Sequence, residues 1–242
     1  MLGYLPTTGI KEIKYKIGDP YIYPENIEKN FSEKILRLPN IWSDFVVKQN
    51  VNIPQSSFDK KNDQFIYDPS DPVPTTGGST CCSEDVTPVP MGPREQKKIE
   101  HRNDILIFTT ESLENDIEVT GPIEMILYAS TDCKDTDFTC KLIDVFPDGK
   151  SINIAQGIQR ARYRDSWENP ELLDSGKIYR FTIDMWSSSN YFFKNHKIRI
   201  EISSSNFPQF DRNPNTGNEF GIDTPDGIKL LLMAAIDHAG AG

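Results

Sequence analysis

Alternating hydrophobic and polar residues dominate the stretch from Thr136 to Arg164 and predict a long β-hairpin there. Phe138, Cys140 and Leu142 alternate with polar side chains, which is the period of two of a half-buried strand. The Pro-Asp-Gly sequence at 147–149 is typical of a turn, because proline presets φ, aspartate bonds to nearby backbone and glycine tolerates positive φ. A hairpin this long is not stable by itself in water, so we expect a second sheet to bury its apolar face.

Further strands are predicted on both sides of the hairpin. Apolar or alternating runs occur at 105–110, 117–130, 177–186 and 196–204. Gly121 and Pro122 lie inside the second run and indicate a bulge or corner rather than its end. The last apolar run, 228–236, fits a strand or a short helix, and its length does not decide between them.

The alternation is clearest in the run at 196–204, where one set of side chains is apolar and the other charged. Ile198, Ile200 and Ile202 are expected to face the core, and Lys197, Arg199 and Glu201 to face solvent. Several strands of this kind, with long polar connections and no strand-helix alternation, predict an all-β fold: an antiparallel two-sheet sandwich of jelly-roll type. A doubly wound α/β fold is excluded by the same pattern.

The chain is expected to divide into a leader at 1–63 and the jelly-roll domain at 64–242. Within the leader, alternation at 13–17 predicts one strand. Ile27, Phe31 and Ile35 recur every four positions between two prolines and predict a short helix. The polar, breaker-rich end of the leader, from residue 48, is typical of a linker or surface loop.

Composition excludes several classes of partner. With 36 acidic and 26 basic residues the net charge is −10, which repels nucleic-acid backbones and anionic lipid. No apolar run approaches the roughly 20 residues of a membrane span, and the first residues lack the order of a signal peptide. We therefore predict a cytoplasmic protein with neither nucleic acid nor membrane as partner.

Four cysteines, at 81, 82, 133 and 140, do not form a disulfide framework in a chain of this length. Adjacent Cys81 and Cys82 could join only through a strained ring, so reduced thiols are expected. Neither cysteine spacing is the C-x2-C of a zinc site, and the three histidines stand apart from one another. No metal or other cofactor is therefore predicted.

Two polar clusters have both a binding and a structural interpretation. The three aspartates at 132–137 could bind calcium, but the glycine and glutamate spacing of an EF-hand is missing, which favours capping and turn roles. Asp211, Arg212 and Asn213 could form a bidentate ion pair and Asx turns. That combination favours a rigid structural loop over a binding site.

Residues for nucleophilic catalysis are not recognisable. The G-x-S-x-G elbow that exposes the serine of an α/β-hydrolase is absent from the sequence. Ser203 to Ser205 lie at the end of a predicted strand, where hydroxyl groups satisfy backbone. His101 and His196 have no partner within the sequence pattern and are expected in loops or at the surface. The chain is predicted to be inactive by itself.

Five segments, in this order and spacing, resemble the C-terminal domain of the X-Pro dipeptidyl-peptidase and cocaine esterase (CocE/NonD) family of serine hydrolases. They are YDPSDPVPTTGG, GPREQ, EHRNDILIFTTESLENDIEVTGP, STDCKDTDFTCKLIDVFPDGKSINIAQGIQRARYR and NHKIRIEISSSNFPQFDRNPNTG, between Gln64 and Asn218. The resemblance implies a galactose-binding-like jelly roll that follows an α/β-hydrolase domain. That absent domain carries the Ser-Asp-His triad, so no catalytic residue transfers to this chain.

The resemblance also assigns two side chains in the loop after the Gly-Gly pair. In cocaine-esterase-like members this loop places two residues beside the acyl pocket of the catalytic domain, and the corresponding positions here are Cys81 and Cys82. The alternative is two small apolar thiols in an ordinary loop. The family ends with a further strand whose His-Pro-Ser segment this sequence lacks, which would leave a sheet edge open to pairing in a homo-oligomer.

The predicted function is a non-catalytic C-terminal module that packs on the α/β-hydrolase domain of its enzyme and partly roofs the active site. The enzyme would cleave Xaa-Pro dipeptides or acyl esters. The alternative is a free-standing jelly roll that binds carbohydrate or another ligand, with exposed Trp167 and Trp186 as stacking platforms.

Overall fold

The structure of the chain is a computed structural model that divides into two compact units, residues 1–48 and 49–242. It describes residues 63–80, 89 and 91–224, together with the backbone of 15–18, 34–37 and 231–234. The expected division into a leader at 1–63 and a domain at 64–242 stays a prediction. No helix among the described residues is long and apolar enough to cross a membrane.

The first unit contains two short parallel strands, β1 (Tyr15–Gly18) and β2 (Lys34–Arg37). The predicted helix is therefore wrong at Ile35, which lies in β2. The other two positions of its pattern, Ile27 and Phe31, lie outside the described residues. A spacing of four is also a multiple of two, so residues that share one face of a helix can equally share one face of a strand.

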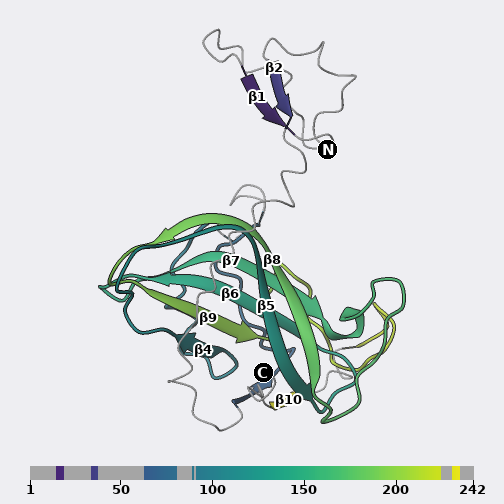
Figure 1. Ribbon diagram of the computed structural model, residues 1–242. Helices are drawn as coiled ribbons and strands as arrows, with labels where there is room; N and C mark the ends of the chain where they lie inside the picture. Colours follow the sequence, from purple (N-terminus) through teal and green to yellow (C-terminus); the bar gives the residue numbers. More distant parts are fainter. Residues whose placement is uncertain are drawn as a thin grey trace. The chain divides into compact units, whose positions relative to one another are not determined.

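The second unit is a sandwich of two four-stranded antiparallel sheets, as predicted (Figure 1). The first sheet has the order β3 (Gln64–Tyr67), β10 (Leu231–Ala234), β5 (Ile117–Thr131), β8 (Tyr179–Phe192). The second has the order β4 (Leu106–Thr109), β9 (Lys197–Ser203), β6 (Asp137–Val145), β7 (Ser151–Arg160). A 3-10 turn, η3 (Ala161–Tyr163), follows β7. The ambiguous run near the C-terminus thus contributes a strand, and β10 lies inside its sheet.

The core lies between the two sheets. Phe181, Ile183 and Met185 of β8 pack with Leu127 of β5 on one side, and residues of β6 and β9 pack against them from the other. Ile198 and Ile202 are buried, and Ile200 is partly buried against the same cluster, as the alternation predicts. Burial of these side chains removes apolar surface from water, which is the main source of stability for such a sandwich.

The central hairpin is confirmed as the pair β6 and β7. Its turn closes through hydrogen bonds from the Phe146 N–H to the Lys150 carbonyl and from the Gly149 N–H to the Phe146 carbonyl. Gly149 has a φ of +85°, and the Asp148 side chain accepts a hydrogen bond from the Lys150 N–H at 3.0 Å. These are the roles that the Pro-Asp-Gly sequence predicts.

The predicted irregularity in β5 is also confirmed, and it has a counterpart in β8. The register of the two strands shifts between Pro122 and Glu124, where two residues of β8, Met185 and Trp186, lie opposite one residue of β5. β8 does not end there, as the sequence pattern suggested, but pairs on to Phe192. Because both strands bend at the same place, pairing continues past the bulge, and β5 and β8 run side by side along their length in Figure 1.

The outer face of the second sheet differs from the prediction. Glu201 is buried, at 3% exposure, instead of facing solvent. The segment 94–105 lies over this face: Gln96 Oε1 accepts a hydrogen bond from Lys141 Nζ at 3.0 Å, and Glu100 pairs with Arg199 at 2.7 Å. The polar side chains of an alternating strand face solvent only where no other segment covers that face of the sheet.

Candidate functional site

A pair of glycines closes the base of the loop that contains Cys81 and Cys82. The Gly78 N–H donates to the Gly92 carbonyl at 2.8 Å, and the Gly92 N–H donates to the Gly78 carbonyl at 2.9 Å. Gly77 and Gly78 have positive φ values, and a Cβ at Gly77 would lie 2.4 Å from the Gly92 carbonyl oxygen. Only glycine fits so close a backbone approach, so the Gly-Gly pair fixes where the loop begins. The two cysteines themselves lie outside the described residues.

A chain of amide and hydroxyl groups joins this loop base to the sheet. The side chain of Gln209 accepts a hydrogen bond from Gln156 Nε2 of β7, and its own Nε2 donates to Ser79 Oγ at 3.0 Å. The Gln209 N–H donates to Thr75 Oγ1 at 3.1 Å. The Gly78 side of the loop base is therefore held in place by hydrogen bonds from Gln209, which is far away in the sequence.

A cleft of about 220 Å³ opens beside the loop base. Its walls come from the loop base, from β7 and from the bulge of β8; they comprise Gly78, Ser79, Gly92, Pro93, Asn153, Ile154, Ala155, Gln156, Met185, Trp186 and Ser187. None of these lining residues is charged, although charged residues make up 26% of the chain. The cleft is the part of the described surface nearest in sequence to Cys81.

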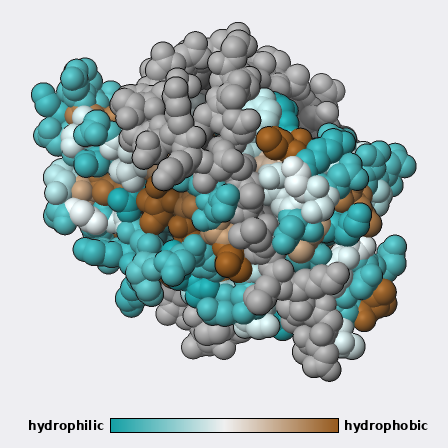
Figure 2. Space-filling model, turned by 90° about the horizontal axis from the view of Figure 1, so that it is seen from below, coloured by the Kyte–Doolittle hydropathy of each residue, from teal (hydrophilic) through white to brown (hydrophobic). Residues whose placement is uncertain are grey.

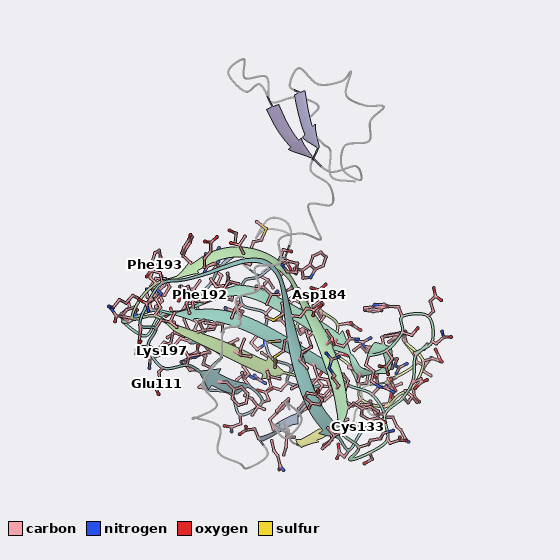
Figure 3. All side chains as sticks on the ribbon, viewed as in Figure 1. Glu111, Cys133, Asp184, Phe192, Phe193 and Lys197 are labelled. Carbon is pink, nitrogen blue, oxygen red and sulfur yellow. The ribbon has the colours of Figure 1, made fainter. Side chains whose placement is uncertain are left out.

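Trp186 is the largest side chain of this cleft and has an uncommon backbone conformation. Its φ is +64°, a region that costs a residue other than glycine about 1–3 kcal/mol. The indole is nevertheless 74% exposed, so burial of the ring does not offset that strain. Figure 3 labels the neighbouring Asp184, whose carboxylate accepts the Trp186 N–H at 2.8 Å and holds the turn.

Exposed hydrophobic residues elsewhere are dispersed. On the face shown in Figure 2, hydrophobic residues form small areas separated by hydrophilic ones. At the opposite end of the sandwich from Cys133, labelled in Figure 3, Phe193 and Tyr191 stack on each other with centroids 6.4 Å apart. Trp167 is 75% exposed and stacks on Tyr163 at 5.5 Å. Scattered apolar residues of this kind are normal for a protein surface.

Of the three loop residues singled out in the sequence, Asp211 and Asn213 contact side chains at the ends of β6 and β7, and only Asn213 is buried. Asp211 pairs with Arg160 at 3.2 Å rather than with Arg212, whose Nη1 donates to the Pro69 carbonyl at 2.9 Å. Asn213 Nδ2 donates to Asp135 and to Asp137, each at 3.0 Å. That this loop has a purely structural role stays a prediction, which substitutions can test.

Two of the three aspartates considered for calcium, Asp135 and Asp137, are ion-paired. Asp135 accepts hydrogen bonds from both the backbone and the guanidinium of Arg162, and Asp137 is bound by Arg160 Nε at 2.7 Å. Burial raises the pKa of Asp137, and the hydrogen bonds from Arg160 and Asn213 oppose that effect. Within the described ranges no group of three or more His, Cys, Asp or Glu side chains could hold a metal ion.

His196 lies in the loop between β8 and β9, one of the two places expected for it, but it is buried rather than at the surface. It is 8% exposed, its Nδ1 lies 2.8 Å from Asp144 Oδ1, and its ring packs on Phe146 at 4.5 Å. The two partners are 52 residues apart and meet only because β9 pairs with the end of β6. The sequence could reveal this pair only to a reader who already knew the register in which β6 and β9 pair.

The serines near the end of β9 have structural contacts. Ser203 Oγ lies 2.6 Å from Thr139 Oγ1, and Ser205 Oγ accepts the Val73 N–H at 2.8 Å. Neither group contacts the His196 and Asp144 pair in these interactions. Cys133 and Cys140 are buried, and burial raises the pKa of Cys140 above its usual range, which keeps that thiol protonated.

The second unit is thus a two-sheet sandwich with a cleft beside the base of one loop. Residues 49–227 match the family described as the X-Pro dipeptidyl-peptidase C-terminal non-catalytic domain. The match covers more than half of the chain, and the chain therefore belongs to this family. The resemblance noted in the sequence is confirmed.

Relatives of known sequence or structure agree with this assignment. Cocaine esterase of Rhodococcus sp. (strain MB1 Bresler) is 46% identical over 155 residues, which are 64% of this chain and 26% of that protein. An aminopeptidase from a Thaumarchaeota archaeon and an α-amino acid ester hydrolase are each 25% identical, with TM-scores of 0.66. The chain covers 32% and 31% of those two structures, which in turn cover 74% of the chain. This sequence thus spans about a quarter to a third of the length of its relatives.

Proposed function

We propose that this chain is the C-terminal module of a serine hydrolase that packs on an α/β-hydrolase catalytic domain and partly roofs its active site. The observation that carries the proposal is the uncharged cleft beside the glycine-closed loop base. The family resemblance supports a position of Cys81 and Cys82, in this loop, next to the acyl pocket. Acyl-ester hydrolysis is the activity we propose for the whole enzyme, because the relative with 46% identity is a cocaine esterase. Dipeptidyl-peptidase activity is the other candidate that the family suggests.

A domain exchange tests this proposal. Residues 49–242 would replace the corresponding domain of the Rhodococcus cocaine esterase, and hydrolysis of a short p-nitrophenyl ester would be compared with that of the esterase lacking its C-terminal domain. We expect the exchanged enzyme to be clearly more active than the truncated one. Equal activity of the two proteins would refute a roofing role for this module.

Alkylation of the cysteines tests the position of the loop in the same exchanged enzyme. Thiols react only where reagent reaches them, so Cys81 and Cys82 should react more slowly in the exchanged enzyme than in the free chain. Cys133 and Cys140 are buried in the sandwich and provide internal controls that should stay unreactive in both. Equal rates for the first two cysteines would mean that they lie in an ordinary loop away from the interface.

A carbohydrate- or ligand-binding module is the second candidate, and the exposure of both tryptophans favours it. Trp167 and Trp186 are 75% and 74% exposed, as a stacking platform requires. They belong to separate groups, because Trp186 lines the cleft and Trp167 stacks on Tyr163. Titration of the chain with oligosaccharides, followed by tryptophan fluorescence, would detect such binding. A homo-oligomer and a cytoplasmic location stay predictions.

A further inference from the structure

The conformation of Trp186 is fixed by three features of the fold. The bulge of β8 sets the residue outside the regular ladder. The Asp184 carboxylate accepts the Trp186 N–H and so stabilises the turn. In the other sheet, Gly157 of β7 lies so close that a Cβ there would be 2.1 Å from the Asp184 carbonyl oxygen. Strain that is held in place from several sides, around an exposed side chain, indicates function rather than packing.

The surroundings of Trp186 indicate the chemistry of what it contacts. Several polar groups of the cleft are bonded within the protein: Asn153 Oδ1 accepts the Arg94 N–H at 2.6 Å, Ser79 Oγ accepts Gln209 Nε2 at 3.0 Å, and Gln156 Nε2 donates to Gln209. Gln156 Oε1 is buried without a hydrogen-bond partner among the described residues. A sugar needs several accessible hydrogen-bonding groups around its stacking face, whereas these three groups are engaged within the protein. The cleft therefore fits an apolar, uncharged contact.

The size of the cleft decides between a small ligand and a protein side chain. Pockets for small ligands usually measure about 300–1,000 Å³, and this cleft has about 220 Å³. Protein interface centres, in contrast, are depleted in charged residues and enriched in tryptophan. Since the relatives are three to four times longer than their match to this chain, a large protein partner exists for the domain in each of them.

We propose that Trp186 is the anchor by which this domain binds the catalytic domain of its hydrolase, with the indole and the cleft beside it receiving an apolar, uncharged segment of that domain. This inference rests on the proposed function and assigns the energy of binding between the two domains to one residue. An anchor of this kind typically carries a large share of the affinity, although its neighbours contribute little.

The substitution Trp186→Gly separates anchoring from a structural role, because it should raise the stability of the chain while it lowers the affinity for the catalytic domain. Glycine adopts positive φ without strain, so the midpoint of thermal unfolding of the 242-residue chain should rise by about 2 °C. Affinity for the catalytic part of the Rhodococcus cocaine esterase, made without its own C-terminal domain, should fall by about thirtyfold. Trp186→Asn, which also tolerates this backbone region, should reproduce both effects.

Trp167→Ala is the matched control, since Trp167 is equally exposed but lies outside the cleft. It should leave the affinity unchanged within about twofold, as expected for a residue away from the interface centre. A lower unfolding midpoint for Trp186→Gly would show a structural tryptophan, and unchanged affinity would show that the anchor lies elsewhere; either overturns the inference. Failure of the unsubstituted chain to bind the catalytic part would refute the proposed function itself, and the assigned partner with it.

Discussion

The two polar regions that border β7 differ in how their groups are satisfied. Where β7 ends, Arg160 and Arg162 meet buried carboxylates and Asn213, and every one of these groups has a charged or amide partner. Near the middle of the same strand, none of the described residues that line the cleft is charged, and the cleft presents an exposed, strained Trp186. We expect the first region to stabilise the fold and the second to bind a partner.

The difference teaches where to look for function in a domain that lacks catalytic groups. Perturbed or clustered charges often mark active sites, but buried ion pairs serve structure as well. In this domain each of the charged groups named above has a partner within the protein. The largest side chain of the cleft, that of Trp186, is instead exposed and has a strained backbone conformation. Substitutions in the two regions should therefore have effects of different size and sign.

The largest effect is expected at the buried carboxylate of the charged region. Asp137→Ala removes a side chain that is 1% exposed and leaves the Arg160 guanidinium, itself 16% exposed, with only a solvent-exposed partner. Breaking one half of a buried ion pair costs about 3–5 kcal/mol, so the free energy of unfolding should fall by that amount. Urea denaturation of the chain measures it. A loss below about 1 kcal/mol would mean that the network contributes little to stability.

The next effect concerns the support beneath the cleft. Gly157→Ala places a Cβ against the Asp184 carbonyl, where backbone cannot move aside as a flexible side chain would. Overpacking of this kind costs about 1–3 kcal/mol, and it should also displace Trp186 and weaken binding of the catalytic domain. The control is Gly149→Ala in the hairpin turn, where φ is +85° but no atom lies within 4 Å. That variant should lose stability from backbone strain only, with binding intact.

A smaller effect, dependent on pH, is expected from the buried pair beneath segment 94–105. Burial raises the pKa of Glu201 to about 7, and burial lowers the pKa of Lys141 to about 8. Folded Glu201 binds its proton more tightly than unfolded Glu201, so its contribution is present below about pH 4.5 and is lost as pH rises through 7. Glu201→Gln should remove this loss, which amounts to about 1–3 kcal/mol of the free energy of unfolding.

The measurement is the free energy of unfolding of both proteins between pH 4.5 and 9. The glutamine variant should gain stability relative to the unsubstituted chain as pH rises to 7. Lys141 contributes in the opposite direction, because its folded pKa is depressed: its contribution is complete above about pH 10.5 and is lost as pH falls through 8. Parallel pH profiles for the two proteins would show that burial does not raise the pKa of Glu201 in the folded chain.

The sandwich was predictable from sequence because its strongest signals are local. The turn at 147–149 and the alternation of β6 and β9 each depend on residues a few positions apart. The burial of Glu201 and of His196 was missed because it depends on a covering segment and on strand register, which alternation cannot reveal. Likewise, Trp186 could be singled out as a large aromatic residue, but its conformation follows from a bulge of β8 opposite β5, whose paired residues lie some 60 positions away.

The smallest effect is expected from Asp211, which sharpens the comparison because it shares a partner with Asp137. Both carboxylates bind Arg160, but the Asp211 side chain is 78% exposed and that of Asp137 is 1% exposed. An exposed ion pair contributes about 0–1 kcal/mol, since water screens the charges and competes for them. Asp211→Ala should therefore leave the free energy of unfolding nearly unchanged, and its small effect should disappear in 1 M salt. If the loss of unfolding free energy approached that of Asp137→Ala, the two aspartates would act as one cooperative network regardless of their different exposure. The loop at 211–213 would then contribute as much to stability as the buried ion pair at Asp137.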